Sequence, residues 1–144
     1  MISRKTGMSL NSLFAALSFV FFSLAPVHAQ VTLTVGNGSG FIGATENQLS
    51  VSLSNQEDQV KAVQMRICDT DDYLVCTQCE TTDRTSTASC VSNETDGCCN
   101  VTLYYFGNDL IEVGTGPIFT LLYEVNSAAP PGECRDVTPL NVNI

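Results

Sequence analysis

The 144-residue sequence contains no tryptophan, one histidine and only six basic residues. The histidine, His28, lies in an amino-terminal segment that we expect to be removed, so Ser-His and Cys-His nucleophile pairs are excluded from the remainder. A hydrolase could still use paired carboxylates such as Asp69, Asp71 and Asp72. These acids share one polar stretch, however, and no tryptophan is available to line a sugar subsite. The sequence therefore predicts a protein that is not an enzyme.

The amino-terminal segment has the three parts of an export signal. Two basic residues precede an apolar run from Leu13 to Leu24, and a small-residue end at Ala29 comes before Gln30. The run is shorter than the roughly 20 residues that a helix needs to cross a bilayer, and no second such run follows. We expect residues 1–29 to be a cleaved signal peptide and residues 30–144 to be secreted, extracellular and without a membrane span.

Basic residues become scarcer still once the signal peptide is removed. Four remain against fifteen acidic residues, a formal charge of −11. Such a chain repels phosphate backbones and anionic lipids, so we expect no nucleic-acid partner and no binding to membrane surfaces. The length of residues 30–144 is enough for one domain with one core, and not for two.

Short alternating stretches, separated by clusters of Gly, Asn, Asp, Ser and Pro, are typical of an antiparallel all-β domain. In residues 48–54, for example, Leu49, Val51 and Leu53 alternate with polar residues, as in a strand with one buried face. No segment shows convincing helical periodicity. Seven strands are expected: 31–35, 48–54, 60–67, 101–106, 110–113, 117–125 and 137–144. Their number predicts an antiparallel two-sheet β-sandwich of the jelly-roll type.

The same alternation predicts which side chains face the core on the other strands. We expect these to be Val63, Met65 and Ile67, then Val101, Leu103 and Tyr105, and finally Phe119, Leu121, Tyr123 and Val125. The last expected strand runs to the final residue, which leaves open whether the chain is truncated there.

Cysteines are concentrated in residues 68–100, which hold six of the seven. The seven are Cys68, Cys76, Cys79, Cys90, Cys98, Cys99 and Cys134. In an exported protein we expect disulfides, with one cysteine left free or bonded to another molecule, and the sequence does not fix the pairing. Because residues 68–100 are polar with few aliphatic side chains, we interpret them as a disulfide-stapled insertion outside the core, ordered by covalent loop closure.

A zinc or redox site is the alternative for these cysteines. Cys76-Thr77-Gln78-Cys79 has the spacing of such a motif, and other cysteines nearby could complete a four-thiolate site. Export, the lack of histidine and the lack of a βαβ context favour structural disulfides instead.

A calcium loop is a weaker alternative. The acidic run Asp69–Asp72, with Glu80 further along, resembles such a loop. However, Tyr73 and Leu74 stand where the loop requires an oxygen ligand and a glycine. We predict no bound metal or cofactor, and calcium in another loop geometry stays an open alternative.

Three stretches resemble the cohesin-like modules of the superfamily of carbohydrate-binding β-sandwiches. Residues 31–67 combine a strand, a glycine-bearing turn and a second strand with Val60–Ile67, which is similar to the family's third strand. Residues 114–121 resemble its glycine turn before a long apolar strand, and residues 128–133 resemble its proline and glycine turn before the closing strand. The resemblance implies a non-catalytic binding module for polysaccharide degradation or extracellular assembly. Its partner would be a dockerin, which is a small calcium-binding module, or a polysaccharide.

Exposed side chains on the expected strands are the candidate binding residues. The resemblance suggests Gln64, Arg66, Tyr104 and Glu124 for a sheet face that binds a partner. Among the four tyrosines, Tyr105 and Tyr123 have the phase of core residues, which leaves Tyr73 and Tyr104 as candidates for stacking on sugars. The cysteine-rich segment replaces a stretch that, in cohesins, forms part of the sheet that faces the dockerin. The expectation that this chain binds a dockerin is weaker for that reason. The alternative function is that of a structural cell-surface protein crosslinked through its unpaired cysteine.

Overall fold

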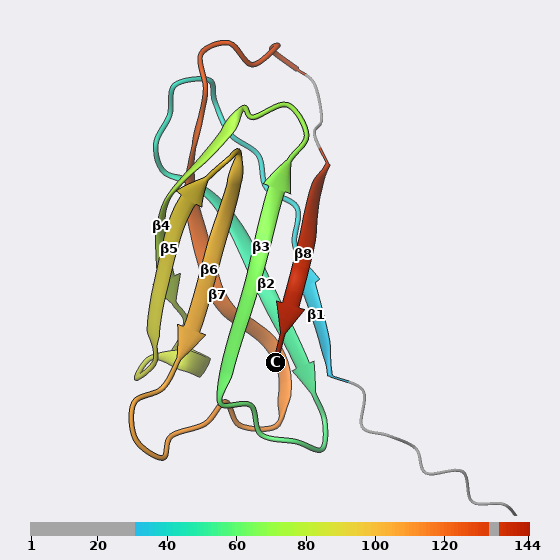
Figure 1. Cartoon of the computed structure of the whole chain (residues 1–144), viewed down its shortest axis with the longest axis vertical. Coiled ribbons are helices and arrows are strands. Elements are labelled where there is room, and N and C mark those ends of the chain that lie inside the picture. The colour runs from blue at the N-terminus through green and yellow to red at the C-terminus, as the bar shows by residue number, and fades with distance from the viewer. Residues whose placement is uncertain (1–30, 133–135) are drawn as a thin grey trace, which may run out of the picture.

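The computed structural model describes residues 31–132 and 136–144 (Figure 1). The expected signal peptide and Cys134 lie outside this part of the chain. The described residues contain eight strands and one short 3₁₀ turn, η1 (Asp83–Thr85), and none of their helices could cross a membrane. The strands are β1 (Thr32–Val35), β2 (Asn47–Asn55), β3 (Ala62–Asp69), β4 (Leu74–Thr81), β5 (Ser89–Thr95), β6 (Cys98–Tyr104), β7 (Gly114–Val125) and β8 (Val137–Asn143).

The strands form two four-stranded sheets that pack face to face (Figure 1). One sheet has the order β1-β2-β7-β4 and the other the order β5-β6-β3-β8, and every strand pair is antiparallel. We call them the 1-2-7-4 sheet and the 5-6-3-8 sheet. This arrangement confirms the predicted two-sheet antiparallel sandwich.

The core lies between the sheets and consists of the side chains at alternate strand positions. The buried residues include those that the sequence predicted to face inward: Leu49, Val51, Leu53, Val63, Met65, Ile67, Val101, Leu103, Tyr105, Phe119, Leu121 and Tyr123. Val125 is partly buried against them. Period-two alternation therefore identified the apolar face of β2, β3, β6 and β7, because each of these strands buries one face only.

Ile118 is buried although its neighbour Phe119 is buried too. The pairing of β2 with β7 shifts by one residue, so that Phe119 lies opposite Val51, Pro117 lies opposite Ser52, and Ile118 has no partner on β2. Such a bulge turns two consecutive side chains to the same face. Both are fully buried, and the simple alternation predicted only Phe119.

Residues 68–100 are part of the sandwich, and the interpretation of this segment as lying outside the core is wrong. They supply the edge strand of each sheet, β4 and β5, and the start of β6. Their inward positions hold cysteines in place of aliphatic residues, and Cys76, Cys79, Cys90 and Cys99 pack against the core. The expectation of disulfides in this segment is confirmed.

The strand expected at residues 110–113 does not form. Ile111 makes one antiparallel bridge to Val60, and its side chain is fully buried. The apolar residue in this short stretch therefore anchors a loop to the core instead of belonging to a strand.

Candidate functional site

The outward face of the 5-6-3-8 sheet is the candidate binding surface, and we call it the 5-6-3-8 face. Antiparallel partners lie on the same side of a sheet, so the register gives the rows of side chains that cross it. The rows are Thr95, Cys98, Cys68 and Thr138; Asn93, Asn100, Arg66 and Leu140; Val91, Thr102, Gln64 and Asn143; and Ser89, Tyr104 and Ala62. The cysteine-rich residues 68–100 therefore contribute a whole strand, β5, to this face.

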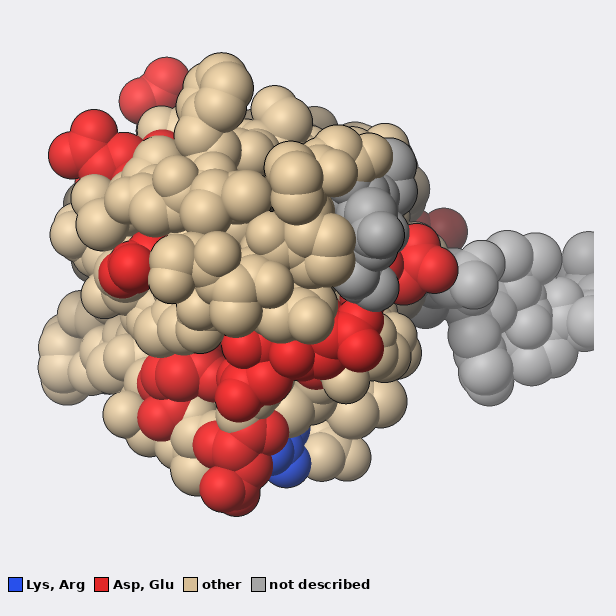
Figure 2. Space-filling view, turned by 90° about the horizontal axis from the view of Figure 1, so that it is seen from above, with Lys and Arg blue, Asp and Glu red and all other residues tan. Residues whose placement is uncertain are grey.

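Arg66 is the only charged residue in these rows, although the whole chain has a formal charge of −9. Glu94 of β5 points the other way, toward the interior, because it pairs with buried Cys99. Acidic side chains instead gather over the end of the sandwich that Figure 2 shows. Asp71 and Asp72 are exposed in the loop between β3 and β4, and Asp96 is exposed between β5 and β6. The 5-6-3-8 face thus has a positive centre on an acidic molecule.

The guanidinium of Arg66 has an unused hydrogen-bond donor. One of its terminal nitrogens donates to the backbone oxygen of Thr95 at 3.4 Å, while its Nε is buried without a hydrogen-bond partner. The long bond to Thr95 is exposed to solvent, so a partner's acceptor can approach the terminal nitrogens and form a stronger, charge-assisted bond there. The position therefore favours a partner that brings a carboxylate or a carbonyl oxygen.

Apolar side chains surround this polar centre. Val91 and Leu140 are 53% and 44% exposed. At the end of β6, the rings of Tyr104 and Phe106 meet edge to face with centroids 5.0 Å apart, and Phe106 is largely exposed. Apolar groups close to neutral polar ones, with few charges, are typical of the central part of protein–protein interfaces.

Three disulfides fix the cysteine-rich strands. Cys68–Cys98 joins β3 to β6 within the 5-6-3-8 sheet, with its Cα atoms 4.2 Å apart. The other two connect the sheets: Cys76–Cys99 joins β4 to β6 and Cys79–Cys90 joins β4 to β5, with Cα–Cα distances of 5.7 and 5.5 Å. The edge of the sandwich beside the 5-6-3-8 face is therefore closed covalently.

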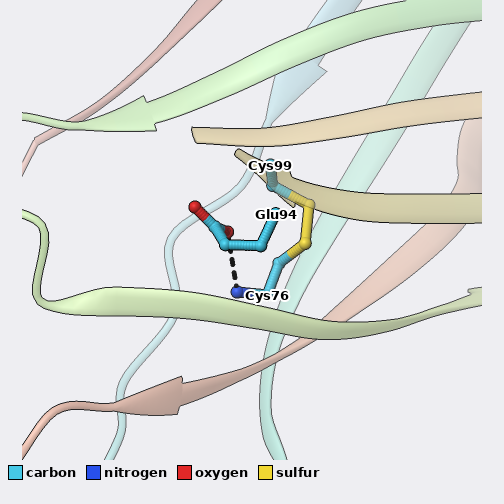
Figure 3. Close-up of side chains that lie close together, drawn as sticks. All are labelled: Cys76, Glu94 and Cys99. Atoms are coloured by element: carbon cyan, nitrogen blue, oxygen red, sulfur yellow. Dashed lines mark hydrogen bonds between the residues drawn. A yellow bond between two sulfur atoms is a disulfide. The ribbon is translucent and has the colours of Figure 1, made fainter. Parts of the chain in front are cut away.

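The zinc or redox alternative is not supported by the positions of the cysteines. Cys76 and Cys79 are each bonded to a different partner. Glu94 lies close to the Cys76 and Cys99 sulfurs, and its carboxylate accepts a hydrogen bond from the Cys76 backbone N–H at 3.1 Å (Figure 3). Because metal ligation requires thiolates, this group cannot bind zinc while the disulfide is intact.

The acidic run also has a structural use. The carboxylate of Asp69, at the buried end of β3, accepts the backbone N–H groups of Asp71, Tyr73 and Leu74 at 3.1, 2.6 and 3.0 Å. Glu80 lies six residues beyond Leu74 on β4, which corresponds to about 20 Å along a strand. The acids that resemble a calcium loop in the sequence are therefore not brought together.

The predicted binding residues occupy three different places. Gln64, Arg66 and Tyr104 share the 5-6-3-8 face, whereas Glu124 is on β7 of the other sheet and Tyr73 is in the β3–β4 loop. Their role in binding stays a prediction. The residues that sequence reasoning missed are those of β5 and β8 in the same rows, and the alternation of residues 89–95 was the available signal.

Comparison with known proteins gives matches among solved structures. No family model and no curated protein matches the sequence. The cohesin CaCohA2 from Clostridium acetobutylicum is 22% identical, with 77% of this chain and 74% of that chain covered and a TM-score of 0.59. A non-cellulosomal cohesin from Archaeoglobus fulgidus is 14% identical, with 79% and 76% covered and a TM-score of 0.60.

A third similar structure is a complex. It contains the sixth cohesin of scaffoldin B from Acetivibrio cellulolyticus together with a Cel5 dockerin. Its identity to this chain is 16%, with 77% and 82% covered and a TM-score of 0.61. The order of strands, the two sheets and these similarities together show that the chain has the fold of cohesin domains.

Proposed function

We propose that this chain is a non-catalytic binding module that binds a small protein partner of the dockerin type through the 5-6-3-8 face. The observation that carries the proposal is the charge of this face. On an acidic chain, its rows contain no carboxylate and one guanidinium, which makes a single long, solvent-exposed hydrogen bond.

The similar structures support the kind of partner. Cohesins of the same fold are seen in complexes with dockerins, from Acetivibrio cellulolyticus among others. The sequence argument against a dockerin was that the cysteine-rich segment replaces part of the sheet. Since this segment forms β5 and begins β6 of the 5-6-3-8 sheet, that argument no longer applies.

The chemistry of the described residues supports a function without catalysis. None of them is a histidine, and six cysteines are in disulfides, so they are not available as nucleophiles. The three disulfides also support export as part of the proposal, because such bonds persist in oxidising compartments. Assembly of polysaccharide-degrading proteins outside the cell is the setting that we propose.

Calorimetric titration of purified residues 30–144 with a panel of dockerins, including the Cel5 dockerin, tests the proposal. We expect saturable binding to at least one of them. Arg66→Gln should weaken that binding about tenfold or more, because the partner's acceptor loses its charged donor. If no dockerin of the panel binds, the proposal is wrong.

Lys61→Gln is the matched control, since it removes the same charge. Lys61 donates to the backbone oxygens of Gly107 and Asp109 and lies five residues before Arg66, about 16 Å along the strand direction. We expect its binding to equal that of the unmodified protein. Equal weakening in both variants would mean that overall charge, and not the 5-6-3-8 face, determines binding.

A further inference from the structure

A cavity lies at one end of the sandwich, away from the rows of the 5-6-3-8 face. It has a volume of about 540 Å³ and is formed where the segment after β1, the β3–β4 loop and the segment after β7 meet. Its lining includes Tyr73, Tyr123, Leu49 and Val125, together with Pro130 of the segment after β7. This volume is within the range of roughly 300–1,000 Å³ that is usual for small-molecule sites.

The position of Tyr73 in this wall is fixed by its backbone. Its N–H donates to the carboxylate of Asp69 at 2.6 Å, and its carbonyl oxygen accepts the N–H of Asn126 at 2.8 Å. Asp69 ends β3 and Asn126 follows β7, so the loop is attached to both sheets. A wall that is already ordered before a ligand arrives lowers the entropic cost of binding.

The glycine-rich segment after β1 forms another part of the wall through its backbone. The N–H of Gly36 donates to the carbonyl oxygen of Ser50 at 2.8 Å. A Cβ atom on Gly38 would lie 2.8 Å from the hydroxyl of Tyr123 and 2.7 Å from the carbonyl oxygen of Gln48. Only glycine allows the backbone to approach Tyr123 and Gln48 so closely.

The charges around the cavity exclude one class of ligand. Among the described residues that line it, Asp136 is the only charged one, and none is basic. The exposed acidic side chains of this end of the molecule are nearby (Figure 2). Asp136 and the nearby acidic side chains would repel phosphates, sulfates and carboxylates, and the described lining residues offer no cation to pair with them.

The remaining groups fit a neutral, polyhydroxylated ring. Tyrosine rings and Pro130–Pro131 offer apolar surfaces to the C–H face of a sugar, while Asn37, Asp136 and the glycine-rich backbone offer polar groups to its hydroxyls. Burial raises the pKa of Tyr123, so its hydroxyl stays protonated and can donate at neutral pH. We propose that this cavity binds a neutral saccharide of one or two sugar units, independently of any protein on the 5-6-3-8 face.

Amide chemical-shift titrations of residues 30–144 with glucose, N-acetylglucosamine, cellobiose and xylobiose at millimolar concentration test this site. We expect at least one sugar to shift the amides of Gly38 and Tyr73 in a saturable way, and glucose 6-phosphate not to do so. Tyr73→Ala should weaken the binding about tenfold, because it removes one stacking surface. The hydrogen bonds of Tyr73 with Asp69 and Asn126 use backbone groups, which the variant retains.

Val113→Ala is the control variant, because it truncates an exposed apolar side chain that does not line the cavity and lies just before the start of β7. It should leave sugar affinity unchanged. Tyr123→Phe, which keeps the ring and removes the hydroxyl, should weaken binding by a smaller factor than Tyr73→Ala. The proposal is overturned if none of the four sugars shifts these amides, if glucose 6-phosphate binds as well as glucose, or if Val113→Ala abolishes binding while Tyr73→Ala does not.

Discussion

Cys76 and Cys79 lie three residues apart on β4, yet both side chains face the interior of the sandwich. In a regular strand an odd spacing places two residues on opposite faces. Here Cys76 lies opposite Tyr123 and Cys79 lies opposite Leu121, whereas Thr77 has no partner on β7. The bulge at Thr77, whose hydroxyl donates to a β7 carbonyl oxygen at 3.1 Å, lets one edge strand form both intersheet disulfides.

Loss of the Cys76–Cys99 disulfide should therefore loosen the edge that β4 forms. For a loop closed over a sequence separation of 23, chain entropy gives a stabilisation of about 3 kcal/mol. We expect the double variant Cys76→Ala/Cys99→Ala to lose about this much free energy of unfolding, measured by urea denaturation. A loss well below about 1 kcal/mol would show that pairing with β7 alone holds β4 in place.

Arg84 should be the most important polar residue for the stability of the end of the sandwich at which β2 ends and β7 begins. Its guanidinium donates to the carbonyl oxygens of Leu53, Glu112, Gly114 and Gly116 and to the side-chain oxygen of buried Asn55. Arg84→Met should lower the free energy of unfolding by about 2–4 kcal/mol, because these oxygens lose their donor. Arg84→Lys should recover only part of it, since an ammonium group lacks the forked geometry.

The measurement is urea denaturation, with Arg66→Met as the matched control. Arg66 makes one long bond, to Thr95, so its replacement should cost less than about 1 kcal/mol. Equal losses in the two methionine variants would mean that the Arg84 bonds contribute nothing beyond the packing of the side chain.

The sequence predicted β2, β3, β6 and β7 because each shows apolar side chains at every second position. It did not predict β4 and β5, for physical reasons that particular residues make clear. On β4 the bulge at Thr77 breaks the alternation, and the inward positions of both strands hold cysteines such as Cys79 and Cys90. Disulfides between these cysteines stabilise the two strands, and the strands therefore show no alternating hydrophobic pattern in the sequence.

Alternation also predicted part of the candidate site, namely its residues on β3 and β6. Alternation alone places Gln64 and Arg66 outward on β3 and Tyr104 outward on β6. Their neighbours on β5 and β8 depend on which strands pair, and that choice follows from contacts between distant segments. The disulfide pairing depends on the same topology, since Cys68–Cys98 joins strands separated by 30 residues.

Asp69→Ala should destabilise the β3–β4 loop. Three backbone N–H groups, of Asp71, Tyr73 and Leu74, would lose a charged acceptor. We expect a loss of about 2–3 kcal/mol in the free energy of unfolding, and a smaller loss for Asp69→Asn, which keeps one side-chain oxygen. Amide hydrogen exchange should also become faster at Tyr73 and Leu74. Unchanged exchange at these two amides would contradict the role of Asp69 in holding the loop.

The two buried tyrosines should make the fold sensitive to alkaline pH. Burial raises the pKa of Tyr123 above 10.0. Burial also raises the pKa of Tyr105, with Asp109 and Glu112 adding to the shift and Arg84 opposing it. A folded-state pKa above the unfolded value means that the folded chain holds these protons more tightly. The stabilisation is therefore complete below about pH 10 and is lost as the pH rises through the folded-state values.

Urea denaturation at a series of pH values, with free thiol alkylated to prevent disulfide exchange, measures this effect. We expect the free energy of unfolding to fall above about pH 10 in the unmodified protein and to fall less steeply in Tyr105→Phe/Tyr123→Phe. Absorbance at the phenolate band should show two tyrosines that ionise at higher pH in the folded protein than in the unfolded protein. If the double variant loses stability as steeply as the unmodified protein, the alkaline sensitivity comes from other groups, because phenylalanine has no proton to release.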